Sequence, residues 1–290
     1  MNKIIGKNEQ LKTELIEALL RSLPSAEKSV IDAIFSELDK IDTTGGNFSS
    51  GILTADQLLS FEDAINTALK KSGFNKNAEL FINDLGKITL NTSGILDAVG
   101  YSHQKLPLSK IEKKWKAQTA ETLLNSGINE NFKRPILQIL DNAISYGESI
   151  DGAKKRLTEF IQSGADKSGK LKSYITQTAR DSVSQLQGQQ MQSLATEAGY
   201  NTVLYVGGTQ TDSRGQCWRW VRELNGKIPR EKLEEEIRQA YKFEKAKREF
   251  PMGHKWSGMM PNTTVDNFIV KRGGFNCTHT AIPSKKSLKK

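Results

Sequence analysis

Apolar side chains recur at three- and four-residue spacings through the first 165 residues of this 290-residue chain. This spacing places them along one face of an α-helix, which is typical of the buried face of a helix in a bundle. We therefore predict a helical region over residues 1–165 that serves oligomerisation or partner binding. The predicted faces are Ile31, Ile34, Phe35, Leu38 and Ile41; Leu58, Phe61, Ile65 and Leu69; Ile111, Trp115 and Leu123; Ile136, Leu140 and Ile144; and Leu157, Phe160 and Ile161.

Local signals predict where several helices begin. Thr54 and Ser109 each precede a Gln or Glu by three residues, which is the form of a capping box at a helix start.

Segment 164–169 is a predicted linker, and a long helix over 170–198 should follow it. The glutamine-rich second half of that helix fits solvent exposure, or a contact with another protein or a polar channel. Its glutamines are Gln185, Gln187, Gln189, Gln190 and Gln192, and its packing positions are Leu171, Ile175, Ala179 and Leu186.

The pattern changes after Gly199. Residues 202–206 and 267–270 are rich in β-branched and aromatic side chains, and glycines lie close to their ends. We predict that both segments are strands. We predict that residues 230–250 form a charged amphipathic helix, which ends at Pro251. The narrow apolar face of that helix consists of Leu233, Ile237 and Ala240.

These elements predict a mainly α fold, with an N-terminal helical bundle followed by a small α+β domain over residues 166–283 that has a few short strands. Residues 284–290 form a basic tail. With 37% hydrophobic and 26% charged residues, the composition is that of a folded globular chain. No apolar run reaches the roughly 18 residues of a membrane span, and no signal peptide is recognisable. We therefore expect synthesis in a cytosol.

The positive charge is concentrated in the last quarter of the chain. Residues 213–290 hold 18 basic and 8 acidic side chains, which accounts for the whole net charge of +9. Such asymmetry indicates a polyanionic partner, either nucleic acid or an acidic protein surface. The other interpretation is a solvated basic face that favours solubility.

Both cysteines and two of the three histidines also lie after residue 200. Cys217, His254, Cys277 and His279 together make a ligand combination typical of zinc. The chain has no Cys-x-x-Cys spacing, so three interpretations stay open. They are a zinc site, unliganded buried thiols with a hydrogen-bonded histidine, and a disulfide between the two cysteines. A scaffold of several disulfides is excluded, because the chain has only these two cysteines.

The second half of the chain holds a series of short motifs in a fixed order. They are Ala179-Arg180-Asp181, Tyr205-Val206-Gly207-Gly208, Asp212-Ser213-Arg214 with Cys217, Leu224-Asn225-Gly226-Lys227, Trp256 with Gly258-Met259, and Gly273-Gly274-Phe275-Asn276-Cys277-Thr278-His279 with Pro283. This series resembles the C-terminal domain of phage head-morphogenesis proteins, the minor head proteins similar to the Mu F family. The resemblance covers roughly residues 145–283 and depends on the order of the motifs. Two departures are Asp181 in place of the usual Thr and the charged helix over 230–250.

The resemblance implies a virion protein present in a few copies inside the capsid and near the portal, after assembly in the host cytoplasm. Its implied partners are the portal, scaffold or major capsid protein, and packaged double-stranded DNA. The resemblance also implies that the residues at the motif positions hold the domain together. In this sequence those positions are Asp212, Arg214, Cys217, Gly226, Gly273, Gly274, Asn276, Cys277 and His279.

Contact with packaged DNA would be non-specific and salt-sensitive, because phosphate charge would supply it. The alternative function is an enzyme, a nuclease or transferase-like effector delivered to the host, with Asp212, His254 and His279 as its acid/base or ligand groups. We expect a structural protein instead, because no nucleophile–base spacing, phosphate loop or carboxylate pair is recognisable. A host DNA-binding protein is disfavoured by the lack of helix-turn-helix or zinc-finger spacing. The candidate DNA contacts are Arg219, Arg222, Arg230, Arg238, Lys242, Lys245, Lys247 and Arg248.

Overall fold

The computed structural model describes residues 2–49, 51, 53–98, 100–164, 167–209, 213–245, 259–274, 277 and 279–285. Helices dominate this part of the chain and the strands are short, so the predicted mainly α fold with a small α+β part is confirmed. Within the described residues, no helix has both the length and the apolar character needed to cross a membrane.

The longer helices are α1 (Asn2–Leu20), α2 (Leu23–Leu38), α3 (Ala55–Lys71), α4 (Phe74–Ala98), α5 (Leu108–Leu124), α7 (Arg134–Ser145), α8 (Ile150–Ile161), α9 (Lys170–Ala198) and α11 (Leu233–Lys245). Shorter helical segments are η1 (His103–Lys105), α6 (Ser126–Ile128), η2 (Asn129–Lys133), α10 (Gly215–Trp218), η3 (Arg219–Glu223), η4 (Arg230–Lys232) and α12 (Phe268–Lys271). The strands are β1 (Thr43–Thr44), β2 (Asn47–Phe48), β3 (Thr202–Val206), β4 (Lys227–Pro229) and β5 (Thr280–Ser284).

The chain forms two compact units. The first, which we call the sheet unit, consists of Met1–Thr13, Leu85–Trp115 and Ala179–Lys290. The second, which we call the bundle unit, consists of Glu14–Asp84 and Lys116–Thr178. The predicted domains divide the chain by element type along its length, whereas these units group residues by contact. Because their limits fall inside helices, α1, α4, α5 and α9 each contribute residues to both units.

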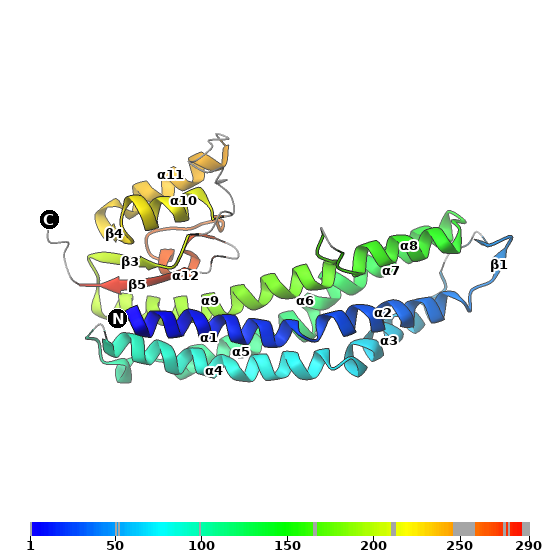
Figure 1. Ribbon diagram of the computed structural model, residues 1–290, viewed down its shortest axis with the longest axis horizontal. Helices are drawn as coiled ribbons and strands as arrows, with labels where there is room; N and C mark the ends of the chain where they lie inside the picture. Colours follow the sequence, from blue (N-terminus) through cyan, green and yellow to red (C-terminus); the bar gives the residue numbers. More distant parts are fainter. Residues whose placement is uncertain are drawn as a thin grey trace. The chain divides into compact units, whose positions relative to one another are not determined.

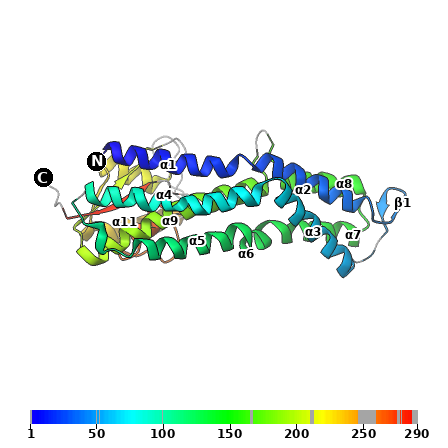
Figure 2. The same cartoon turned by 90° about the horizontal axis from the view of Figure 1, so that it is seen from below.

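In the bundle unit, α2, α3, α7 and α8 lie side by side (Figure 1, Figure 2). The predicted capping box at the start of α3 is confirmed, since Gln57 donates its backbone N–H to the Thr54 hydroxyl and accepts one from the Thr54 backbone. The apolar stripes supply the core, as their spacing predicts. Fully or nearly buried members of these stripes are Ile31, Ile34, Leu38, Phe61, Ile65, Leu69, Ile136, Leu140, Ile144, Leu157 and Ile161.

The sheet unit is built on a three-stranded antiparallel sheet with the order β4-β3-β5. The predicted strand over residues 202–206 is confirmed as its central strand, β3. In Figure 1 this sheet lies between the C-terminal part of α9 and the segment that contains α10 and α11. Helix cover on both sides explains why all five residues of β5 are buried. The apolar core includes Val203, Trp220, Ile237 and Phe268.

Several predicted elements differ from the structure. The predicted strand at 267–270 is wrong, because Phe268–Lys271 is the short helix α12. β-Branched and aromatic residues favour a strand because they fit a half-buried surface. Here Phe268, Ile269 and Val270 are all buried in succession, so the segment does not present such a surface. Arg272 then takes a φ of 44° and ends the helix. The predicted capping box at Ser109 is also wrong, because α5 already begins at Leu108, directly after Pro107.

Two predicted boundaries shift. The helix predicted over 230–250 opens with the turn η4 and continues as α11, while residues 246–250 lie outside the described chain. Its predicted apolar face, Leu233, Ile237 and Ala240, is buried as expected. The predicted tail over 284–290 begins too early, because Ser284 is the last residue of β5 and pairs with Thr202. The predicted helix 170–198 is confirmed as α9.

The glutamines of α9 are not all exposed. Gln187 and Gln190 are fully buried inside the sheet unit. Gln187 donates to Asn8 of α1 over 3.0 Å, and Gln190 donates to Thr89 of α4 over 2.8 Å. Buried amides are stable only when hydrogen-bonded, so these bonds define how α1 and α4 pack on α9 within the unit.

Helix α9 also approaches α12 closely at Gly188. A Cβ atom there would lie 2.8 Å from the Val270 Cα and 3.0 Å from the Ile269 carbonyl oxygen.

We expect Gly188→Ala to destabilise the protein by about 1–3 kcal/mol, because the added methyl group strikes backbone that cannot move easily. The matched control is Gly94→Ala in α4, where nothing lies within 4 Å of the new atom. That change should stabilise the helix by roughly 0.5–1 kcal/mol. Urea unfolding compares the two, and equal effects would contradict the close packing.

Candidate thiol–imidazole site

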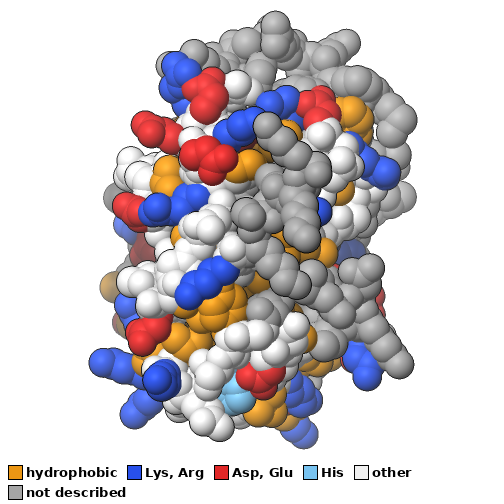
Figure 3. All heavy atoms as spheres, turned by 90° about the vertical axis from the view of Figure 1, so that its left-hand side faces the viewer, with side chains coloured by type: hydrophobic (Ala, Val, Ile, Leu, Met, Phe, Trp, Pro, Cys, Tyr) orange, Lys and Arg blue, Asp and Glu red, His pale blue; other side chains and the backbone are white. Residues whose placement is uncertain are grey.

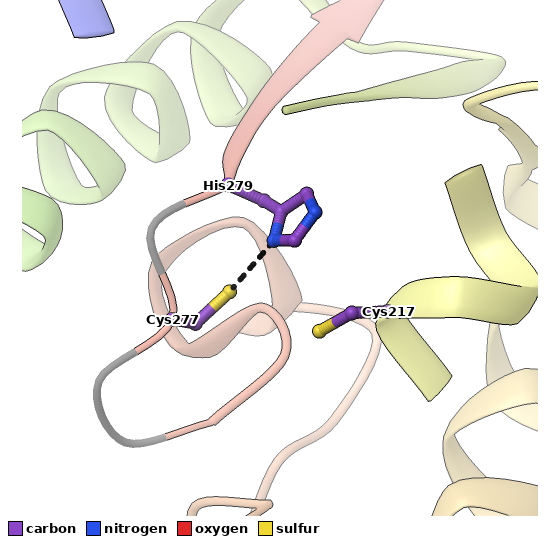
Figure 4. Close-up of side chains that lie close together, drawn as sticks. All are labelled: Cys217, Cys277 and His279. Atoms are coloured by element: carbon purple, nitrogen blue, oxygen red, sulfur yellow. Dashed lines mark hydrogen bonds between the residues drawn. The ribbon is translucent and has the colours of Figure 1, made fainter. Parts of the chain in front are cut away.

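Cys217, Cys277 and His279 come together inside the sheet unit. Their Sγ atoms and an imidazole nitrogen all lie within 4.8 Å of one another. The three residues are 2%, 4% and 4% exposed. Cys217 comes from α10, Cys277 from the connection between α12 and β5, and His279 from the residue before β5 (Figure 4). The fold therefore gathers two thiols and one imidazole from separate segments into one buried cluster.

Tyr205 of β3 forms one wall of this cluster. Its hydroxyl oxygen is 3.2 Å from each of the two sulfur atoms. Its ring stacks on the His279 imidazole, with centroids 4.8 Å apart and planes 17° from parallel. Trp220 packs edge-on against the Tyr205 ring at 5.1 Å. Aromatic contacts of this kind fix ring orientation, so the hydroxyl is held between both sulfurs.

Two glycines make room for the cluster. A Cβ atom at Gly273 would lie 2.4 Å from the Cys217 sulfur, 2.6 Å from the Tyr205 hydroxyl and 2.9 Å from the Cys277 sulfur. A Cβ atom at Gly207 would lie 2.5 Å from the His279 ring. Real side chains do not tolerate such distances, so both positions require glycine for steric reasons.

Hydrogen bonds from side chains to backbone carbonyls hold the connection between α12 and β5 in place. Arg214 and Gln216 each donate a side-chain N–H to the Gly273 carbonyl at 3.0 Å. Ser184 of α9 donates its hydroxyl to the Cys277 carbonyl at 3.2 Å. Arg272 donates to the Ser184 carbonyl at 2.6 Å. The cysteine-bearing loop is thus fastened to α9 on one side and to the α10 segment on the other.

The two thiols have different electrostatic environments. A hydrogen bond between them raises the pKa of the Cys217 thiol well above its usual value and lowers the pKa of the Cys277 thiol well below its usual value. His279, whose Nδ1 is 3.7 Å from the Cys277 sulfur, and the nearby Arg272 guanidinium lower the pKa of Cys277 further. Burial is the main cause of the strongly raised pKa of Tyr205. The cluster therefore favours one thiolate, at Cys277.

Buried cations surround this potential thiolate. Arg272 is 1% exposed, and Lys12 of α1 is 4% exposed. Lys12 donates to the Thr280 hydroxyl at 2.7 Å and to the Glu9 carboxylate at 2.8 Å. Burial lowers the pKa of the Lys12 ammonium, while Glu9 opposes that shift. Arg272 lowers the pKa of the Cys277 thiol, whereas the charge of Lys12 is already paired with the Glu9 carboxylate.

The structure brings together three of the four predicted zinc ligands, Cys217, Cys277 and His279. The fourth, His254, lies outside the described residues, as do Asp212 and Asn276 of the predicted motif. Gly226 is in the turn before β4 with a φ of 65°, and it accepts a hydrogen bond from the Tyr205 N–H. Gly274 has a φ of 104° in the turn after α12.

Sequence reasoning misses three members of the site. Tyr205 is assigned to a strand but not to the cluster, although a tyrosine near the end of a strand that runs into two glycines is a usable signal. Gln216 and Arg272 carry no such signal, because their roles are hydrogen bonds to backbone atoms distant in the sequence.

The arginines predicted to contact DNA take part in contacts inside the sheet unit. Arg219 pairs with Glu223 at 2.5 Å and with the buried Glu236 at 2.8 Å. Glu236 also accepts from the Trp220 indole at 3.0 Å, so this pair helps fix the core. The remaining contacts are Arg222 to Thr209, Arg230 over the Tyr200 ring and near Asp266, and Arg238 to Glu235.

The other candidate DNA contacts, Lys242, Lys245, Lys247 and Arg248, lie outside the residues whose side chains the structure describes. On the face drawn in Figure 3, the described Lys and Arg side chains lie among Asp and Glu.

Comparison with known proteins gave no match: no protein-family model, no curated protein and no solved structure aligns significantly with this chain. The resemblance to phage minor head proteins thus stays a prediction from the motif residues.

We expect Gly273→Ala to destabilise the sheet unit by about 1–3 kcal/mol, because the added methyl group would displace both sulfurs and the Tyr205 hydroxyl. The control is Gly208→Ala, because nothing lies within 4 Å of a Cβ atom there. Thermal unfolding under reducing conditions measures both. A melting temperature for Gly273→Ala equal to that of Gly208→Ala would contradict the close packing of the cluster.

Proposed function

We propose that this protein is a minor structural or assembly protein of a tailed-phage head. The observation that supports the proposal is the convergence of the motif residues on which the resemblance depends. Arg214, Cys217, Gly273, Cys277 and His279 are widely spaced in the sequence but meet around one buried cluster. Motif positions that share a packing role are expected to meet in this way.

The burial of the cluster favours a structural role over the alternative of a delivered enzyme. A nuclease or transferase needs its acid/base or ligand groups within reach of substrate. His279 is 4% exposed, and the Tyr205 ring stacks on it. A macromolecular substrate could reach this imidazole only after the sheet unit had rearranged. A domain with three short strands, in contrast, benefits from a polar cluster that joins its segments.

The proposed location is the capsid interior close to the portal, with the portal, scaffold or major capsid protein as partner. Quantitative mass spectrometry of purified particles and procapsids tests this directly, with major capsid peptides as the internal standard. We expect a few to a few dozen copies per particle, or copies in procapsids alone if the protein acts only in assembly. Absence from both kinds of particle would overturn the proposal.

Contact with packaged DNA is a separate part of the proposal. Arg222 and Arg230 are the best candidates among the described side chains, because neither forms a close ion pair with another described residue. Arg222 bonds to the Thr209 hydroxyl, and Arg230 is 3.9 Å from Asp266. Arg219 is a weaker candidate, since binding a phosphate would compete with its contact to buried Glu236. Any such binding should not depend on base sequence.

We expect affinity for duplex DNA to fall steeply with salt, and the double variant Arg222→Ala/Arg230→Ala to reduce the slope of log K against log salt by about 2. Fluorescence anisotropy with two unrelated duplexes measures both effects. The control is Arg134→Ala/Arg156→Ala, which removes the same charge from the bundle unit. A slope that is the same for the wild-type protein and both double variants would contradict the assignment of these contacts.

A further inference from the structure

We propose that Cys217, Cys277 and His279 bind one thiophilic divalent cation of the zinc class, which ties α10 to the connection between α12 and β5. The inference goes beyond the function proposed above and stands without it, because it depends only on the geometry of the sheet unit. It assigns a structural cofactor to that unit.

The donor atoms already have nearly the separations that a tetrahedral cation requires. Zn–S bonds of about 2.3 Å and Zn–N bonds of about 2.0 Å place neighbouring donors roughly 3.5–3.8 Å apart. The Cys277 sulfur is 3.7 Å from the His279 Nδ1, and all three donor atoms fall within 4.8 Å of one another. Small side-chain adjustments would therefore complete three corners of a tetrahedron.

The surroundings of the cluster also suit a metal–thiolate centre. The Tyr205 hydroxyl, 3.2 Å from both sulfurs, is placed to donate a hydrogen bond to a coordinated thiolate. Gly273 and Gly207 clear the space on either side, as a side chain at either position would strike a donor residue. With Nδ1 on the cation, the buried Nε2 of His279 carries the ring proton.

The types of donor atom define the class of cation that the site would take. Sulfur and imidazole donors select zinc-class ions over Mg²⁺ or Ca²⁺, which prefer oxygen. The fourth position would take a water molecule or a further donor.

The cation would contribute to folding, because its ligands come from segments that are far apart in the unfolded chain. Cys217 lies before the charged helix α11, and Cys277 and His279 lie after it. A bond network through the metal would close this long loop and fasten α10 beside Tyr205 of β3. In the reduced, metal-free cluster, hydrogen bonds and packing hold these segments together without such a bond.

The test uses the full chain, expressed in zinc-containing medium and purified without chelators under reducing conditions. Elemental analysis should find zinc at close to one ion per chain. Replacement by Co²⁺ should give the visible bands of tetrahedral cobalt and a thiolate-to-metal charge-transfer band. A chain that is isolated without metal and gives no cobalt spectrum would overturn the proposal, as would free-thiol titration showing a Cys217–Cys277 disulfide.

Cys217→Ser and Cys277→Ser should each abolish stoichiometric binding, whereas His103→Ala, which removes the partly exposed histidine of the same unit, should leave it unchanged.

Since the cysteine variants could unfold, wild-type protein provides the second measurement. A strong chelator should lower its melting temperature, and Zn²⁺ but not Mg²⁺ should restore it. No change with chelator would count against the site. If particles contain the protein without metal, only this inference is overturned. If the protein binds metal but is missing from particles, only the proposed function is overturned.

Discussion

The antiparallel pairing of β3 with β5 is the contact on which the sheet unit depends. It sets Tyr205 opposite Ala281 and Val206 opposite Thr280, so His279 leaves the strand beside the end of β3. From there its imidazole can stack on the Tyr205 ring, whose hydroxyl reaches both sulfurs. A shift of one residue in this register would turn Tyr205 to the opposite face of the sheet and separate it from the cluster.

Buried polar groups, beside the apolar core, help determine how helices join this sheet. Gln187 bonds to Asn8, Gln190 to Thr89, and Lys12 to Thr280. Such groups contribute little net stability, since each loses its hydration on burial, but an unmatched partner is costly. Their value lies in specificity, because only one arrangement of helix and sheet satisfies these bonds together.

The same balance applies to two of the described arginines in the basic last quarter of the chain. The sequence count treats Arg219 and Arg272 as free positive charges. In the fold, Arg219 is matched to Glu236, and Arg272 is buried against a backbone carbonyl. Arg219 is thus paired with carboxylates and Arg272 is buried, so these two charges add little to attraction for a polyanion.

The sequence by itself determined the elements whose burial pattern is local. Helical spacing identified the faces of α2, α3, α7 and α8, and the strand β3 followed from its β-branched residues between glycines. It also singled out Cys217, Cys277 and His279 by residue type. Only the tertiary structure decided that 268–271 is a helix, that Gln187 and Gln190 are buried, and that the three donor residues meet at Tyr205. The reason is physical, because periodicity records which side of an element is buried, whereas its partner depends on contacts between residues distant in the chain.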